Sequence, residues 1–131
     1  MREILFRGKR ADGGGWVEGN LFIPDREDTP TEICIGTNIV RITYEVIPET
    51  VGQYTGLTDK NGKKIFEGDI VRNKCYMGKV EYNDDFAKFY VVYSEFSGNW
   101  FDFEGEHGYP VSLDCEVISN IHDNPELLKG A

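Results

Sequence analysis

Apolar and polar residues alternate along much of the chain, and this pattern predicts β-strands. The clearest run spans residues 40–46, where apolar side chains stand at every second position. A period of two with β-branched residues is typical of a half-buried strand. Residues 89–93 form an unbroken apolar run instead, as expected for a strand buried on both faces. Further short runs predict strands at residues 4–7, 16–23, 33–36, 68–71, 78–82 and 116–121.

Turn-forming residues separate these runs at short intervals. The glycines at 13–15 accept positive φ at no steric cost, and Asn61-Gly62 is a strong hairpin signal. Near the end of the chain, Pro125 favours one or two helical turns within residues 123–128. No helical period extends over ten residues, so the helical content is expected to be small.

Several short strands that are closely spaced by turns predict a mainly β protein. The strand order after residue 56 resembles an SH3-like barrel, so residues 57–131 are predicted to form such a small barrel with a short C-terminal helical turn. Residues 1–56 are predicted to form an N-terminal β region whose strands pack on this barrel or bridge subunits. The alternative is one continuous domain.

Length and composition indicate a protein that folds without disulfides. A chain of 131 residues can bury a core unaided, and 40% hydrophobic and 13% aromatic content argues against disorder. No apolar run approaches the ~20 residues of a membrane-spanning helix, and the N-terminus lacks the apolar stretch of a secretory signal. The widely spaced Cys34, Cys75 and Cys115 are expected in the core. We therefore expect a protein of a reducing cytoplasm with no membrane association.

The net charge of −9 is placed unevenly along the chain. Residues 1–79 carry 12 basic and 12 acidic side chains, whereas residues 80–131 carry 2 and 11. An excess of this sign repels nucleic acid phosphate. The last third is therefore suited to a basic partner surface, to a cation or simply to solubility.

One central stretch, residues 53–71, reads QYTGLTDKNGKKIFEGDIV and resembles the signature of the YopX family of phage and prophage proteins. The start of the chain, with Phe6-Arg7 and Trp16-Val17, and the segments 78–82 and 116–128 resemble that family as well. The resemblance implies a gene carried by a phage or prophage, expression in a bacterial cytoplasm and a mainly β fold. It carries over no activity and no catalytic or ligand-binding residue.

The motif has an architectural interpretation, in which its turn shapes the chain and its apolar residues supply core. The alternative is a binding surface around its polar tip. Residues 57–79 hold six basic and three acidic side chains, with Tyr54 and Tyr76 near enough in sequence to stack on bases. The charge of the whole chain disfavours nucleic acid, and a solvated mixed surface is the simpler account. The candidate surface consists of Lys60, Asn61, Lys63, Lys64, Arg72 and Lys74.

A weaker acidic cluster consists of Asp102, Glu104 and Glu106, which would share one face of an extended strand, with His107 adjacent. Such a face offers oxygen ligands to a hard cation or a pair of carboxylates for acid–base chemistry. The simpler interpretation is a solvated strand face. Because the whole last third is acidic, we also consider an acidic decoy of a host DNA-binding protein.

The sequence contains no recognisable catalytic motif, metal-ligand spacing or phosphate-binding loop. We therefore expect no enzyme activity and no cofactor. Large aromatic residues between positions 76 and 103 are numerous for one small barrel, which suggests a subunit contact and a homo-oligomer. The resulting hypothesis is a phage or prophage accessory protein that binds a host or phage protein. The alternatives are a nucleic-acid-associated module in phage DNA metabolism and the acidic decoy.

Overall fold

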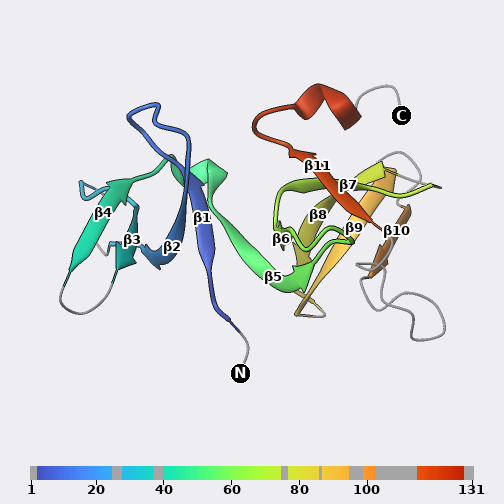
Figure 1. The fold of residues 1–131 in the computed structure, drawn as a ribbon, viewed down its shortest axis with the longest axis horizontal. Coiled ribbons are helices and arrows are strands. Elements are labelled where there is room, and N and C mark those ends of the chain that lie inside the picture. The colour runs from blue at the N-terminus through green and yellow to red at the C-terminus, as the bar shows by residue number, and fades with distance from the viewer. Residues whose placement is uncertain are drawn as a thin grey trace. The chain divides into compact units, whose positions relative to one another are not determined.

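The structure is a computed structural model that describes residues 3–24, 28–36, 40–74, 77–85, 87–94, 99–102 and 115–128. These residues form mainly β-strands, arranged in two antiparallel sheets (Figure 1). By its contacts the chain divides into two compact units, Met1–Tyr54 and Thr55–Ala131, and each is described by itself. The sequence boundary after residue 56 stays a prediction. Among the described residues, no helix combines the length and the apolar character needed to cross a membrane.

The first unit is built from four consecutive antiparallel neighbours and the start of a fifth strand. The order in the first sheet is β4-β3-β2-β1-β5-β6, so each hairpin follows the chain from β1 to β4. A short 3-10 helix, η1 (Pro48–Thr50), precedes β5. The strands are β1 (Phe6–Lys9), β2 (Trp16–Phe22), β3 (Glu32–Gly36), β4 (Arg41–Glu45) and β5 (Gly52–Thr58), which continues into the second unit.

One face of these strands forms the core of the first unit. Cross-strand register places Leu21 opposite Ile33 and Ile33 opposite Tyr44, so side chains two apart along each strand gather on one side. Val17, Ile33 and Val46 are buried there, at 6%, 0% and 2% exposure. Of the alternating apolar residues in 40–46, Val46 is buried and Tyr44 half-buried, as the sequence predicts, whereas Val40 and Ile42 are exposed.

The chain after β4 returns to the end of β1. Arg10 and Val46 form an isolated antiparallel bridge. The amide of Ala11 donates to the carbonyl of Glu45 at 3.0 Å, and the amide of Ile47 donates to that of Lys9 at 2.9 Å. The end of β1 therefore covers the outer edge of β4 at Glu45, and Arg10 is brought close to the residues of β4.

The second unit contains a five-stranded antiparallel sheet of order β10-β9-β8-β7-β11. The apolar side chains of Ile65, Val71, Val80 and Val91 are almost fully buried in its core, together with Cys115. Cys34 is half-buried, and Cys75 lies outside the described residues. The elements are β6 (Lys64–Phe66), β7 (Asp69–Arg72), β8 (Met77–Asn83), β9 (Lys88–Ser94), β10 (Asn99–Asp102), β11 (Glu116–Asn120) and the 3-10 helix η4 (Pro125–Leu128).

The expected SH3-like barrel in residues 57–131 is not confirmed. The described strands form open sheets, and no closed barrel is found among them. The pairing of β6 explains the difference, because this strand joins β5 in the first sheet instead of extending the sheet that starts at β7. The expected C-terminal helical turn is the 3-10 helix at Pro125–Leu128.

The carboxylate of Asp59 organises the centre of the second unit. Its Oδ1 accepts hydrogen bonds from the amides of Asn61 and Lys63, at 2.8 and 2.9 Å. Its Oδ2 accepts one from the amide of Val117 in β11, at 2.9 Å and 58 positions away. Gly62 supplies the positive φ of 81° that closes the turn. One side chain, only 6% exposed, therefore fixes a turn and joins it to a distant strand.

A second buried carboxylate follows ten residues later. Asp69 is 1% exposed, and its Oδ2 accepts the amide of Phe66 at 2.7 Å. Beside it, the amide of Gly68 donates to Val80 and the carbonyl of Gly68 accepts from Ile121, at 2.8 and 2.9 Å. These bonds tie the segment 59–69 to β8, to β11 and to Ile121, which follows β11, and this supports the architectural interpretation of the motif.

We expect Asp59→Asn to lower the free energy of unfolding by roughly 2–4 kcal/mol, because an amide cannot accept three backbone N–H groups with two equivalent charged oxygens. Urea unfolding of the full chain measures the change. The exposed Asp84→Asn serves as the matched control and should change the stability by less than about 0.5 kcal/mol. A loss below that value in Asp59→Asn would show that the carboxylate is dispensable.

The same carboxylate gives stability a defined pH dependence. Burial acts to raise the pKa of Asp59, but the amides of Val117, Lys63 and Asn61 outweigh it and hold the pKa below the ordinary 3.8. A lowered folded-state pKa contributes stability that is present above pH 3.8 and is lost as the pH falls through the folded pKa. The stability difference between the wild type and Asp59→Asn should therefore shrink below pH 3.8. A constant difference from pH 6 to roughly pH 2 would contradict this assignment.

Candidate functional site

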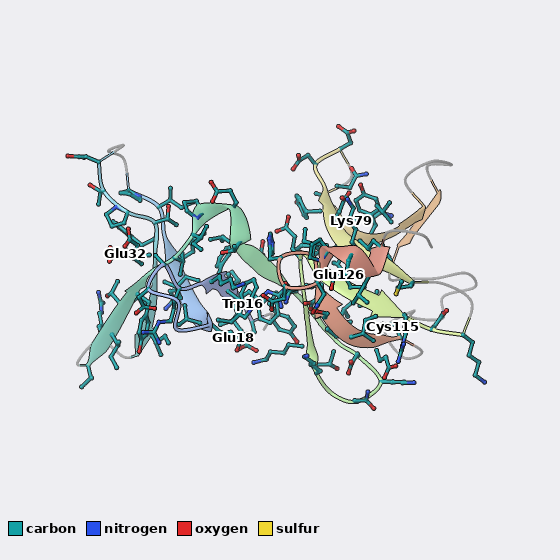
Figure 2. The ribbon with its side chains drawn as sticks, turned by 90° about the horizontal axis from the view of Figure 1, so that it is seen from above. Trp16, Glu18, Glu32, Lys79, Cys115 and Glu126 are labelled. Carbon is teal, nitrogen blue, oxygen red and sulfur yellow. The ribbon has the colours of Figure 1, made fainter. Side chains whose placement is uncertain are left out.

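A hollow of about 580 Å³ lies in the first unit. Volumes of this order are typical of sites that hold a small ligand or a few side chains of a partner. Figure 2 labels two of its lining residues, Trp16 and Glu18, which stand two apart on β2. The hollow is lined by Arg7, Arg10, Trp16, Val17, Glu18, Ile35 and Tyr44.

Strand register explains how the first cation–aromatic pair of the hollow forms. β1 and β2 pair Arg7 with Glu18 and Lys9 with Trp16, so Arg7 stands diagonal to Trp16 on one face. The guanidinium carbon of Arg7 lies 4.8 Å from the centroid of the Trp16 ring. At this distance the ring quadrupole attracts the cation, which holds the arginine against the indole.

The second pair joins residues that are far apart in sequence. Arg10 follows β1, and the return of the chain after β4 brings Tyr44 beside it. The guanidinium carbon of Arg10 lies 4.4 Å from the centroid of the Tyr44 ring. Two arginines, each stacked on an aromatic ring, therefore contribute to the lining of one hollow.

The glycine-rich turn after β1 holds the Arg10 side chain in place. Arg10 Nη2 donates to Asp12 Oδ2 at 2.6 Å, and Asp12 Oδ1 accepts the amide of Gly14 at 2.8 Å. A Cβ at Gly14 would lie 2.5 Å from the Arg10 guanidinium carbon, so the residue there must be glycine for the arginine to keep this position. The guanidinium therefore lies close to both the Tyr44 ring and the backbone of Gly14, with little conformational freedom left to lose on binding.

The Arg10 guanidinium is only partly satisfied within the described part of the chain. Its Nε is buried without a hydrogen-bond partner, while the side chain as a whole is 29% exposed. Among the described residues, Asp12 supplies the one hydrogen-bond acceptor that this guanidinium reaches. The Arg10 hydrogen bond, followed by that of the Gly14 amide, lowers the pKa of Asp12, which is itself exposed to solvent.

Exposed apolar side chains flank the hollow. Ile35 and Ile42 are cross-strand neighbours on the face that carries Tyr44, and they are 39% and 52% exposed. Val40, two positions before Ile42, is 64% exposed. Of the nine large apolar side chains that are exposed among the described residues, seven belong to the first unit, so unburied apolar surface is concentrated there.

The basic residues that the sequence singles out lie in the second unit. Lys60, Asn61 and Lys63 are exposed on the turn shaped by Asp59. Lys64 is half-buried at the start of β6, and Lys74 is exposed beyond β7.

One pair of contacts brings part of this basic set to the same end of the second unit. The amide of Lys60 donates to the carbonyl of Cys115, and Arg72 pairs with Glu116 in the adjoining strand. However, Arg72 Nε also donates to Glu116 Oε1 at 2.9 Å. An acidic partner within the chain therefore offsets one of the expected positive charges.

The acidic cluster falls almost entirely beyond what the structure describes. Asp102 ends β10, while Glu104 and Glu106 lie outside the described residues. The cluster therefore stays a prediction. Elsewhere in the acidic third, Glu81 accepts a hydrogen bond from the Tyr90 hydroxyl at 3.0 Å and pairs with Lys79 at 3.0 Å, so that carboxylate has partners in its own sheet.

The sequence patterns do not predict the hollow. A local signal exists, because Arg7 and Trp16 flank a glycine-rich turn at positions that a hairpin would bring together. No local signal joins Arg10 to Tyr44, which lies 34 positions later and arrives only through the folded path of β2, β3 and β4.

We expect Gly14→Ala to displace the Arg10 guanidinium, because the new Cβ would stand 2.5 Å from its central carbon and a side-chain end moves more easily than backbone. Asp12 then loses its cationic partner, and its pKa should rise toward 3.8. A carboxyl-carbon NMR titration measures this pKa. Gly13→Asn is the control, since its Cβ meets nothing within 4 Å and Asn tolerates positive φ. An unchanged Asp12 pKa in Gly14→Ala would show that Gly14 is not needed to keep the Arg10 guanidinium beside Asp12.

Comparison with known proteins identifies the family of the chain. The chain is similar to the crystal structure of protein EF1440 from Enterococcus faecalis, with a TM-score of 0.59 and 22% identity over 98% of this chain and 100% of that one. At this identity the likeness shows a shared fold. No curated protein matches the chain. A family model described as YopX protein matches residues 5–129, which confirms the resemblance carried by residues 53–71. Because this match spans nearly its whole length, the chain belongs to the YopX family.

Proposed function

We propose that this protein is a non-catalytic module that binds a protein partner through the hollow of the first unit. The arrangement of Arg10 carries the proposal. Its guanidinium is held close to Tyr44 and Gly14, is partly exposed, and borders the exposed apolar pair Ile35 and Ile42. Arginine and aromatic residues next to exposed apolar surface are characteristic of the energetically important part of protein interfaces.

The charge of the first unit favours a protein over a nucleic acid as the partner. Residues 1–54 contain 6 basic and 9 acidic side chains, so the unit is acidic although its hollow holds two arginines. A phosphate backbone would be repelled by this surplus. A protein segment presents single charges among apolar side chains, which matches an isolated arginine beside Ile35 and Ile42.

The resemblance to YopX proteins supports the biological setting in this proposal. We place the protein in the cytoplasm of a bacterial host, as an accessory protein of a phage or prophage that contacts a host or phage protein. Self-association is retained as a prediction that sedimentation of the full chain would test, and exposed apolar side chains of the first unit are consistent with it.

A nucleic-acid-associated module remains the second candidate, because Lys60 and Lys63 are exposed on a turn whose own acid, Asp59, is buried. The ion pair between Arg72 and Glu116 reduces the net charge of this surface. Binding of this kind would weaken steeply with salt, whereas a protein interface with an apolar centre would not. An acidic decoy of a host DNA-binding protein is a third candidate, supported by the 11 acidic and 2 basic side chains of residues 80–131.

A photo-reactive residue at position 42 should form a discrete adduct with one protein in the bacterial host, and excess unmodified chain should abolish this adduct. The same residue at position 43 is the matched control, because Thr43 is also exposed on β4 but its side chain points away from the face that carries Tyr44 and Ile35. Mass spectrometry of the adducts reads the outcome. Equal yields at both positions, or an adduct that unmodified chain does not compete away, would contradict docking at the hollow.

A further inference from the structure

Resting on the proposed function, we infer that the hollow recognises an extended peptide segment in which a carboxylate side chain and an apolar side chain stand two residues apart. The carboxylate engages the exposed end of Arg10, and the apolar side chain lies on Ile35 and Ile42. The inference therefore defines the chemistry of the partner segment, beyond the existence of a protein partner.

The carboxylate follows from the state of the Arg10 guanidinium. A guanidinium presents five N–H donors, and among the described residues only Asp12 accepts one of them from Arg10. The guanidinium carbon lies over the Tyr44 ring and beside Gly14, and the bond to Asp12 uses one Nη2 donor, so further N–H donors remain for a ligand. An anionic oxygen is the strongest acceptor for such an edge. Because Arg10 is already held in position, a ligand carboxylate would not need to order it.

The hollow accommodates a single negative charge better than a phosphate. The carboxylate of Glu18 lines it, and that of Asp12 borders it through the hydrogen bond to Arg10. These two acids balance the two arginines, so the local formal charge is close to zero. A monoanionic side chain can replace part of the Asp12 contact, whereas a phosphate with up to two charges meets more repulsion.

The spacing of two residues follows from strand geometry. Tyr44, over which Arg10 is stacked, and Ile42 are two apart on β4 and share a face. Residues two apart on an extended chain are separated by roughly 6.6–6.8 Å. A peptide in extended conformation along this face therefore places side chains i and i+2 over Arg10 and over the pair Ile35–Ile42, in one of its two directions.

Titration with short peptides, followed by NMR, tests the inference on the full chain. The probe is the capped pentapeptide glycine–glutamate–serine–leucine–glycine, with its reversed sequence as a second probe. One of the two should shift the Tyr44 ring and Ile42 methyl signals saturably, with a Kd on the order of 1 mM. The matched peptide with glutamine in place of glutamate should bind at least about fivefold more weakly. Arg10→Gln should weaken the glutamate peptide to a similar degree, and Lys60→Gln should leave its affinity unchanged.

The possible outcomes separate this inference from the proposed function. Equal binding of the glutamate and glutamine peptides would overturn carboxylate recognition while leaving a peptide-binding hollow in place. Equal binding of a peptide with glutamate and leucine adjacent would overturn the spacing. If no peptide shifts Tyr44 or Ile42, both the inference and the proposed site fail. Stronger shifts at these residues with an oligothymidylate would overturn both in favour of nucleic acid.

Discussion

The second unit depends on one buried carboxylate. Asp59 Oδ1 accepts the amides of its own turn, and Oδ2 accepts the amide of Val117 in β11. A local turn and a contact across 58 positions therefore share a single side chain. The cost of burying the charge is offset by three backbone N–H donors, which is why its pKa is lowered despite burial. Within residues 53–71, Asp59 and Asp69 therefore have a structural role, because each accepts hydrogen bonds from backbone amides.

The same turn chemistry serves a different purpose in the first unit. Asp12 Oδ1 accepts the amide two residues later, as Asp59 Oδ1 does, but Asp12 Oδ2 binds Arg10 where Asp59 Oδ2 binds a distant strand. The buried carboxylate is used for architecture. The exposed one holds a cation over Tyr44 at the edge of a hollow, where a partner can reach it. In the proposed function, the first unit binds the partner. In the second unit, Asp59 and Asp69 stabilise the motif.

The sequence predicts local features well and long-range pairing poorly. The alternation of residues 40–46 predicts β4, and Asn61-Gly62 predicts the turn, because both signals are local. The SH3-like barrel was not confirmed, since closure into a barrel depends on pairings between distant strands, such as that of β7 with β11, which no local signal specifies. The contact of Asp59 with Val117 and that of Arg10 with Tyr44 depend equally on the completed fold. The sequence therefore indicates the basic turn, which is a local feature, but not the hollow.

The central claim is that the family motif builds the protein while the hollow binds its partner. The most direct test compares the yield of the partner adduct at position 42 in two variants, Arg10→Gln and the double substitution Lys60→Gln with Lys63→Gln. Both change exposed or partly exposed side chains, and both should leave the fold intact. The account predicts at least a fivefold lower yield for Arg10→Gln and an unchanged yield for the double variant. The reverse result would contradict it and place the binding surface on the turn of the motif.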